Sequence, residues 1–80
     1  MEIGEALRKR IYELAEEKNI KITKWCLDSN LTPSTIFDFL YNRSKSLTIY
    51  SLAKLCAGIN ITLEEFFAKD YMKEFDDIYK

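Results

Sequence analysis

With 80 residues, the chain is long enough for one small domain with a single core and too short for two. Hydrophobic residues make up 48% and charged residues 31% of it, a mixture that is typical of globular proteins and argues against an intrinsically disordered chain. No apolar run approaches the roughly 20 residues that span a bilayer, and the N-terminus lacks the apolar region of a signal peptide, so we expect a cytoplasmic protein that makes no membrane contact.

The sequence offers little that suggests catalysis or metal binding. It contains no histidine, and its two cysteines, Cys26 and Cys56, lie far apart among apolar positions. Isolated thiols in a cytosolic chain are usually small core residues, and a metal site needs more ligands at closer spacing. The serine-rich stretch at residues 43–46 has no base or orienting partner nearby. We therefore expect no enzyme, no metal, no cofactor and no small-molecule ligand.

The net charge of −1 conceals an uneven distribution along the chain. Residues 20–60 carry five cations and two carboxylates, whereas residues 61–80 carry three cations and six carboxylates. If nucleic acid is the partner, the middle of the chain meets it and the C-terminal end faces away.

Asparagine takes the place of glycine and proline as the marker of helix ends. The chain has two glycines and one proline, but Asn19, Asn30, Asn42 and Asn60 each follow a stretch of apolar residues at helical spacing. After glycine, asparagine best tolerates the left-handed backbone conformation, in which the last carbonyls of a helix are satisfied. The pattern predicts four helix ends, and no strand pattern competes with it.

The first two predicted helices span about residues 3–18 and 22–29. Apolar residues at helical spacing form the buried face of the first helix: Leu7, Ile11, Leu14 and Ala15. The second helix is short and buries Trp25 and Cys26.

The third predicted helix runs from Pro33 to about residue 41. The hydroxyl of Thr32 can cap its first turn, and proline suits the first helical position because no amide donor is needed there. Its apolar positions must face the core: Ile36, Phe39 and Leu40. The side chains left pointing outward are Ser34, Phe37, Asp38 and Tyr41.

The fourth predicted helix starts near Thr48, and Thr62 with Glu65 forms a capping box that opens a fifth helix. The buried residues predicted for the fourth helix are Ile49, Leu52, Ala53, Leu55 and Cys56. The fifth helix carries Phe66 and Phe67. We expect the centre of the core to consist of Trp25, Ile36, Phe39, Leu52 and Leu55.

The last segment, residues 70–80, is predicted to be a further short helix with Asp70 as its cap. Its apolar stripe is too hydrophobic to remain in water, so it packs either on its own domain or on a second copy of the chain. In the second case the dimer interface consists of Phe67, Tyr71, Phe75, Ile78 and Tyr79.

Two short helices joined by residues 28–31 have the outline of a helix-turn-helix. Over residues 11–67 the chain resembles the Cro/repressor-type helix-turn-helix family, also called xenobiotic-response-element regulators, and especially its small bacterial and phage-borne members. Four features carry the resemblance: Trp25-Cys26 in place of the family's Leu-Ala pair, Asn30 in place of its turning glycine, Leu31-Thr32-Pro33-Ser34-Thr35-Ile36 in place of its hydrophobic-Ser-x-x-Thr-Ile, and residues 51–56 and 59–67 near its closing pattern.

The resemblance implies an all-α fold, namely a compact, lambda-repressor-like bundle of five helices with an additional short C-terminal helix. The helix-turn-helix at residues 22–42 would lie in a DNA-binding domain at residues 1–69, and residues 70–80 would form a helical extension. The implied function is that of a transcriptional regulator that binds operator sites in double-stranded DNA as a homodimer. The helix at residues 33–41 would then lie in the major groove.

The resemblance and the outward face of this helix together suggest contact residues. The residues expected to reach base edges are Pro33, Ser34, Phe37 and Asp38. The residues expected to lie along the phosphates are Lys21, Lys24, Tyr41, Asn42, Arg43 and Lys45. A serine hydroxyl bonds to several base edges, a carboxylate accepts from the cytosine amine, and a phenyl ring packs only on a thymine methyl group or a sugar.

Two departures from the family keep a second function open. Ile22 stands where the family often has a phosphate-binding glutamine, and Ala15 stands where it often has arginine. The alternative is a helix-turn-helix module that binds another protein, as an antirepressor or antitoxin-like partner, and does not bind DNA specifically. The DNA hypothesis requires that four cations and the start of the helix at residues 33–41 share one exposed face: Lys21, Lys24, Arg43 and Lys45. It fails if Asp28 and Asp38 dominate that face.

Overall fold

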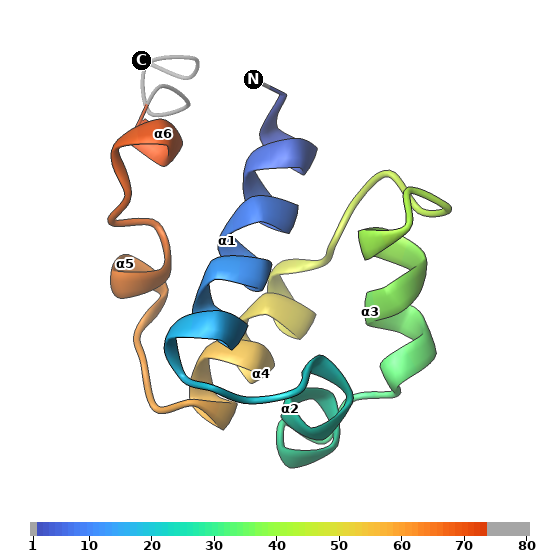
Figure 1. The fold of residues 1–80 in the computed structure, drawn as a ribbon. Helices are drawn as coiled ribbons and strands as arrows, with labels where there is room; N and C mark the ends of the chain where they lie inside the picture. The colour runs from blue at the N-terminus through green and yellow to red at the C-terminus, as the bar shows by residue number, and fades with distance from the viewer. Residues whose placement is uncertain (1, 74–80) are drawn as a thin grey trace.

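The computed structural model describes residues 2–73, and within that range the only regular secondary structure is α-helix (Figure 1). The helices are α1 (Ile3–Glu17), α2 (Ile22–Asp28), α3 (Pro33–Leu40), α4 (Ile49–Gly58), α5 (Leu63–Phe66) and α6 (Asp70–Lys73). The predicted all-α class, with five helices and a short additional one, is confirmed. None of the helices in this range is long and apolar enough to cross a membrane.

All four predicted asparagine helix ends are confirmed. Asn19, Asn30, Asn42 and Asn60 have φ angles of 51°, 59°, 65° and 60°, which lie in the left-handed region. After each asparagine, the next amide donates to the carbonyl five positions earlier, at 2.8–3.0 Å: Ile20 to Ala15, Leu31 to Cys26, Arg43 to Asp38, and Ile61 to Cys56. This is the Schellman arrangement, so the first four helices end by the same local mechanism.

The predicted core centre is confirmed, because Trp25, Ile36, Phe39, Leu52 and Leu55 are all buried. The indole Nε1 of Trp25 donates to the carbonyl of Leu55 at 2.8 Å and so joins α2 to α4. The two free thiols, Cys26 and Cys56, lie in the same core as predicted, where burial raises the pKa of both.

The predicted buried face of α4 is wrong at two positions. Ile49 is 65% exposed and Ala53 is exposed, whereas Ser51 is buried. The reason lies in the cap: the hydroxyl of Thr48 accepts from the amide of Ser51 at 3.1 Å and donates to its hydroxyl oxygen at 3.0 Å. A serine satisfied in this way can turn inward, so the buried arc runs over Ser51 and Leu52 and leaves Ile49 and Ala53 outside it.

Thr32 does not cap α3 with its hydroxyl, so that prediction is also wrong. The amide of Thr35, the usual partner of such a cap, instead donates to the backbone carbonyl of Thr32 at 3.1 Å. Pro33 removes a further donor from the first turn. Replacing Thr32 would therefore remove no side-chain cap from α3.

The capping box of α5 is confirmed. Glu65 donates its amide to the Thr62 hydroxyl at 3.0 Å, and the Thr62 amide donates to the Glu65 carboxylate at 3.0 Å. The other end of this short helix is held by Arg10 of α1, which is only 6% exposed. Its Nε donates to the carbonyl of Phe66 at 2.7 Å, and its Nη2 to that of Glu65 at 3.1 Å.

The last described helix, α6, packs against α1. Asp70 lies in its first turn rather than acting as its cap. Met72 is buried, and the Tyr71 hydroxyl donates to the carboxylate of Glu13. Lys9 of α1 lies over the Tyr71 ring, 4.4 Å from its centroid. Up to Lys73 the segment therefore packs on its own domain; the predicted dimer residues Phe75, Ile78 and Tyr79 lie outside the described residues.

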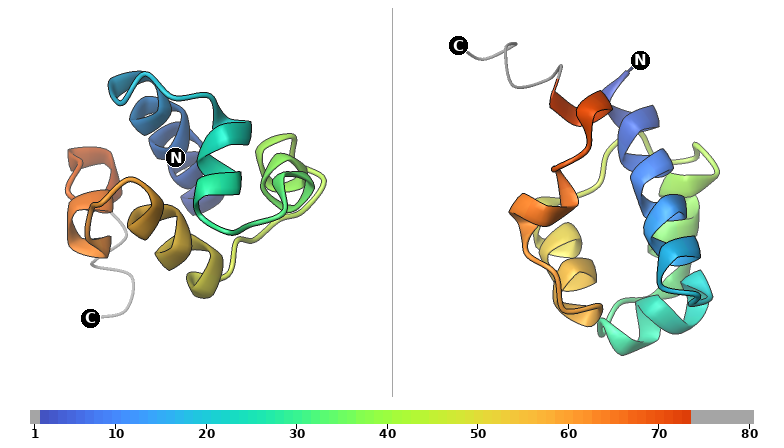
Figure 2. Two further views of the ribbon diagram at one scale, coloured as in Figure 1. Left: turned by 90° about the horizontal axis from the view of Figure 1, so that it is seen from below. Right: turned by 60° about the vertical axis from the view of Figure 1, so that its left-hand side comes forward.

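The helices are arranged so that α3 and the C-terminal helices lie on opposite sides of the molecule. Figure 1 shows α5 and α6 on one side of α1 and α3 on the other, and the view from below in Figure 2 agrees. A surface on α3 is therefore separate from any surface on α5 and α6.

Candidate nucleic-acid interface

Helix α3 is fixed to the core by one face and exposes the other. Ile36, Phe39 and Leu40 are buried, as predicted from their spacing. Ser34 is exposed near the beginning of the helix, and Tyr41 is 57% exposed at its end. Both ends of this face are therefore open to solvent.

Phe37 does not point outward as predicted. It is half-buried, packs against the core, and stacks on Tyr41 with 5.5 Å between ring centroids and 28° between ring planes. The two residues are separated by one helical turn, the spacing at which side chains meet on a helix. They present one joint aromatic surface instead of two independent side chains.

Asp38 is also half-buried, and it forms an ion pair with Arg43 in which the Nη1–Oδ1 distance is 3.3 Å. The backbone brings the two together because the amides of Arg43 and Ser44 both donate to the Asp38 carbonyl, at 2.8 and 3.0 Å. The guanidinium of Arg43 also lies 5.5 Å from the centroid of the Tyr41 ring. Arg43, which was predicted to contact phosphate, thus neutralises Asp38, which was predicted to contact a base.

A second ion pair lies on α2, where Lys24 and Asp28 are 3.2 Å apart at i,i+4 spacing. Lys21, immediately before α2, is exposed. Each of the two carboxylates that could have repelled DNA, Asp28 and Asp38, therefore has a cation beside it. Neither dominates this part of the surface.

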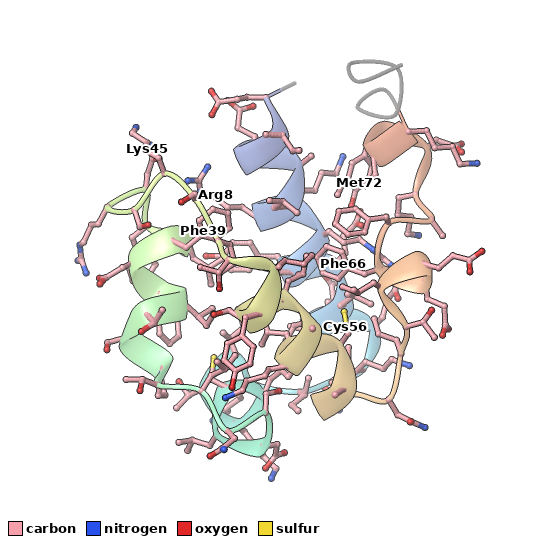
Figure 3. All side chains as sticks on the ribbon, turned by 180° about the vertical axis from the view of Figure 1, so that it is seen from behind. Arg8, Phe39, Lys45, Cys56, Phe66 and Met72 are labelled. Atoms are coloured by element: carbon pink, nitrogen blue, oxygen red, sulfur yellow. The ribbon has the colours of Figure 1, made fainter. Side chains whose placement is uncertain are left out.

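The predicted cations occupy both ends of α3. Lys21 immediately precedes α2 and Lys24 belongs to it, and α2 lies at the beginning of α3, whereas Arg43 and Lys45 belong to the loop after the end of α3 (Figure 1). Figure 3 shows Lys45 at the end of the molecule opposite α2. The exposed side chains of α3 thus lie between two groups of positive charge.

Two residues that the sequence analysis did not select hold the helix pair in place. Lys54 of α4 extends across Tyr50, 4.5 Å from the ring centroid, and donates to the Asn30 carbonyl in the α2–α3 turn at 3.4 Å. At Gly58, a Cβ would lie 2.0 Å from the Ser29 Oγ and 3.1 Å from its Cβ, so α4 approaches the end of α2 closely and any larger residue would require Ser29 to shift. Neither contact has a local signal, because each joins residues far apart in the sequence.

Among known protein families, the model of the Cro/C1-type HTH DNA-binding domain matches residues 10–68. This match contains α2, α3, α4 and α5 in full and the second half of α1. No curated protein and no solved structure gave a significant match.

Proposed function

Because the chain belongs to the Cro/C1-type HTH DNA-binding domain family, we propose that it is a transcriptional regulator that binds specific DNA sequences through α3. The observation that carries the proposal is the exposed face of α3, bounded at both ends by cations whose acidic neighbours are already paired. A helix of this kind enters the major groove and presents its first turns to base edges.

In this proposal the base contacts come from the exposed face of α3, beginning with its first turn. Pro33 and Ser34 lie in its first turn, and the serine hydroxyl donates to or accepts from several base edges. The joint surface of Phe37 and Tyr41 would pack on thymine methyl groups or sugars. Asp38 would accept a hydrogen bond from a cytosine amine, while its ion pair with Arg43 would limit its repulsion by the phosphates.

Affinity that does not depend on sequence would come from the two ends of α3. Lys21 and Lys24 would meet phosphates on one side, and Arg43 and Lys45, together with Tyr41 and Asn42, would meet them on the other. Each phosphate neutralised by a cation releases counterions, so binding should weaken steeply as salt rises.

We also propose that the regulator acts as a homodimer. One copy offers only a few base contacts, each worth about 1–3 kcal/mol when well formed, and that is too little to select a site in a genome. Phe67, which is 36% exposed, directly follows α5, and α5 lies on the side of the molecule away from α3, where a dimer contact would not obstruct DNA (Figure 2). The proposed interface keeps the residues predicted from the sequence: Phe67, Tyr71, Phe75, Ile78 and Tyr79.

One observation favours a second candidate, a protein-interaction module that does not bind DNA specifically. Three large apolar side chains are about two-thirds exposed: Leu27, Ile49 and Tyr50. Exposed apolar surface of this kind is common at protein-binding sites.

Selection of bound duplexes from a random pool separates the two candidates. The DNA-binding regulator should enrich a sequence motif, and a dimer should enrich one with two-fold symmetry. Ser34→Ala should change the enriched sequence, whereas Arg43→Met with Lys45→Met should keep the sequence and weaken binding to all duplexes. If no motif is enriched over the input pool, the proposed function is wrong.

A further inference from the structure

Arg8 lies on α1, outside the helix pair, but its side chain reaches the end of α3 and the loop that follows (Figure 3). Its Nε donates to the Phe39 carbonyl at 2.7 Å, and its Nη2 donates to the Asn42 Oδ1 at 3.1 Å and the Ser44 carbonyl at 3.4 Å. The guanidinium also lies over the Phe39 ring, 4.5 Å from its centroid. One side chain thus binds three points of the chain, one in the last turn of α3 and two in the loop that follows.

Gly4, one helical turn before Arg8, leaves room for this guanidinium. It is buried, and a Cβ there would lie 3.2 Å from the Arg8 Nη1, a tight contact to which the guanidinium would have to adjust by a few tenths of an ångström. Glycine inside a helix costs about 1 kcal/mol relative to alanine. Glycine at this position lets the Arg8 guanidinium lie close to the backbone of α1.

The bonds made by Arg8 suit arginine and not lysine. A planar guanidinium presents five N–H donors in a fixed fork, whereas an ammonium group is a point charge that cannot reach three separated acceptors. Two of the acceptors are carbonyls at or beyond the C-terminal end of α3, where a cation is favoured by the helix dipole. Ser44, whose carbonyl Arg8 binds, lies between the two cations of the loop, Arg43 and Lys45.

We infer that Arg8 is a positioning residue for DNA binding: it fixes the loop at residues 42–46 so that Arg43 and Lys45 are held ready for the phosphates. The inference rests on the proposed function. Arg8 is half-buried and its donors are used inside the protein, so its effect on DNA passes through the loop. A preorganised loop loses less conformational entropy when it binds.

A double-mutant cycle tests this role. Arg8→Lys is measured in the intact chain and in a chain that carries Arg43→Met and Lys45→Met, with the dissociation constant for one duplex determined by fluorescence anisotropy over a range of salt concentrations. In the intact chain Arg8→Lys should weaken binding by about threefold or more, whereas in the chain without the loop cations it should change binding by less than about twofold. The salt dependence should keep its slope, because no phosphate contact is lost.

Arg10→Lys is the matched control. Arg10 lies on the same helix and also binds two backbone carbonyls, but those belong to α5. It should lower the melting temperature without changing DNA affinity while the chain is folded. Equal losses from Arg8→Lys in both backgrounds would show a purely structural role, and a salt slope lowered by about one would show direct phosphate contact; either result overturns the inference.

A measurement without DNA keeps the inference separate from the proposed function. In Arg8→Lys the amides of Arg43 and Ser44 should exchange hydrogen faster than they do in the wild-type chain, whereas the exchange of the α5 amides should not change. The reason is that the Arg43 and Ser44 amides hold the start of the loop on Asp38. Unchanged exchange overturns the positioning role even if DNA binding is established. If the wild-type chain binds no duplex, the proposed function fails and the inference fails with it.

Discussion

Arg43→Met should weaken binding to nonspecific DNA more than Lys45→Met does, although each substitution removes one positive charge. Arg43 is paired with Asp38 at 3.3 Å, so its loss removes a phosphate contact and also leaves a carboxylate unneutralised beside the DNA. Lys45 is exposed and forms no ion pair within residues 2–73, so its loss removes a phosphate contact alone.

The size of the difference follows from Coulomb repulsion. A carboxylate about 6 Å from a phosphate in water is repelled by about 0.7 kcal/mol, which corresponds to roughly a threefold change in the dissociation constant. The pair itself is largely exposed, with side-chain exposures of 68% for Arg43 and 49% for Asp38. Such pairs add little to folding stability, so Arg43→Met should melt almost like the wild-type chain.

The assay is fluorescence anisotropy with a nonspecific duplex, which keeps base recognition by Asp38 out of the comparison. Adding Asp38→Asn to Arg43→Met should recover about the threefold difference, whereas adding it to Lys45→Met should recover less, because Arg43 already neutralises the carboxylate there. Equal losses for Arg43→Met and Lys45→Met, without recovery by Asp38→Asn, would refute the coupling between the loop and α3.

Three further predictions concern stability. Gly58→Ala should destabilise by about 1–3 kcal/mol in denaturant unfolding, because its Cβ meets the Ser29 Oγ, and Ser29→Ala should recover part of the loss. Thr62→Ala should cost about 1 kcal/mol through the lost capping box, whereas Thr32→Ala should change stability little, since its hydroxyl caps nothing. Burial and the Glu13 carboxylate raise the pKa of Tyr71 above its ordinary value of about 10, so the stability from its neutral form should be present below pH 10 and lost as pH rises further.

Each of these predictions has an outcome that contradicts it. A Gly58→Ala protein as stable as wild type would show that α2 and α4 do not pack as closely as described. If Thr62→Ala and Thr32→Ala lowered the free energy of unfolding by similar amounts, the difference between their caps would be contradicted. For Tyr71 the comparison is Tyr71→Phe: the two proteins should lose stability differently above pH 10, and parallel curves would show that the phenol is not involved.

The helix ends could be predicted from sequence because the physics that sets them is local. A left-handed asparagine and the two amides that bond back to the helix lie within six residues of one another, so Asn19, Asn30, Asn42 and Asn60 were sufficient. Apolar spacing likewise predicted the buried face of α3. It failed on α4, since the bond between the Thr48 and Ser51 hydroxyls rotates the buried arc toward a serine, and no hydrophobic pattern contains that information.

The candidate site was only partly predictable, for a related reason. The residues of α3 share one helix, so their exposure follows from spacing, apart from the partial burial of Phe37 and Asp38. Two arginines of α1 bond to carbonyls that are distant in the sequence. Arg8 binds the Phe39 carbonyl at the end of α3, and Arg10 binds the Phe66 carbonyl of α5 on the other side of the molecule. A sequence shows that such residues are cationic, but it does not show which backbone groups they reach.

The dimer proposal has its own decisive measurement, sedimentation at tens of micromolar of the wild-type chain and of a variant with Phe75→Ser and Ile78→Ser. Truncation after Lys69 would be less informative, because it would also remove Met72 from the core. The wild type should run as a dimer and the variant as a monomer. A wild-type monomer at these concentrations would contradict the proposal.

The most direct test of sequence-specific regulation is the ratio of dissociation constants for the selected duplex and for a scrambled duplex of the same composition, measured at physiological salt. Specific DNA-binding proteins prefer their sites by about 10³-fold or more. We predict a ratio of this order for the wild-type chain, a reduced ratio for Ser34→Ala, and an almost unchanged ratio for the chain that carries both Arg43→Met and Lys45→Met. A wild-type ratio near one would contradict the claim that α3 reads DNA sequence.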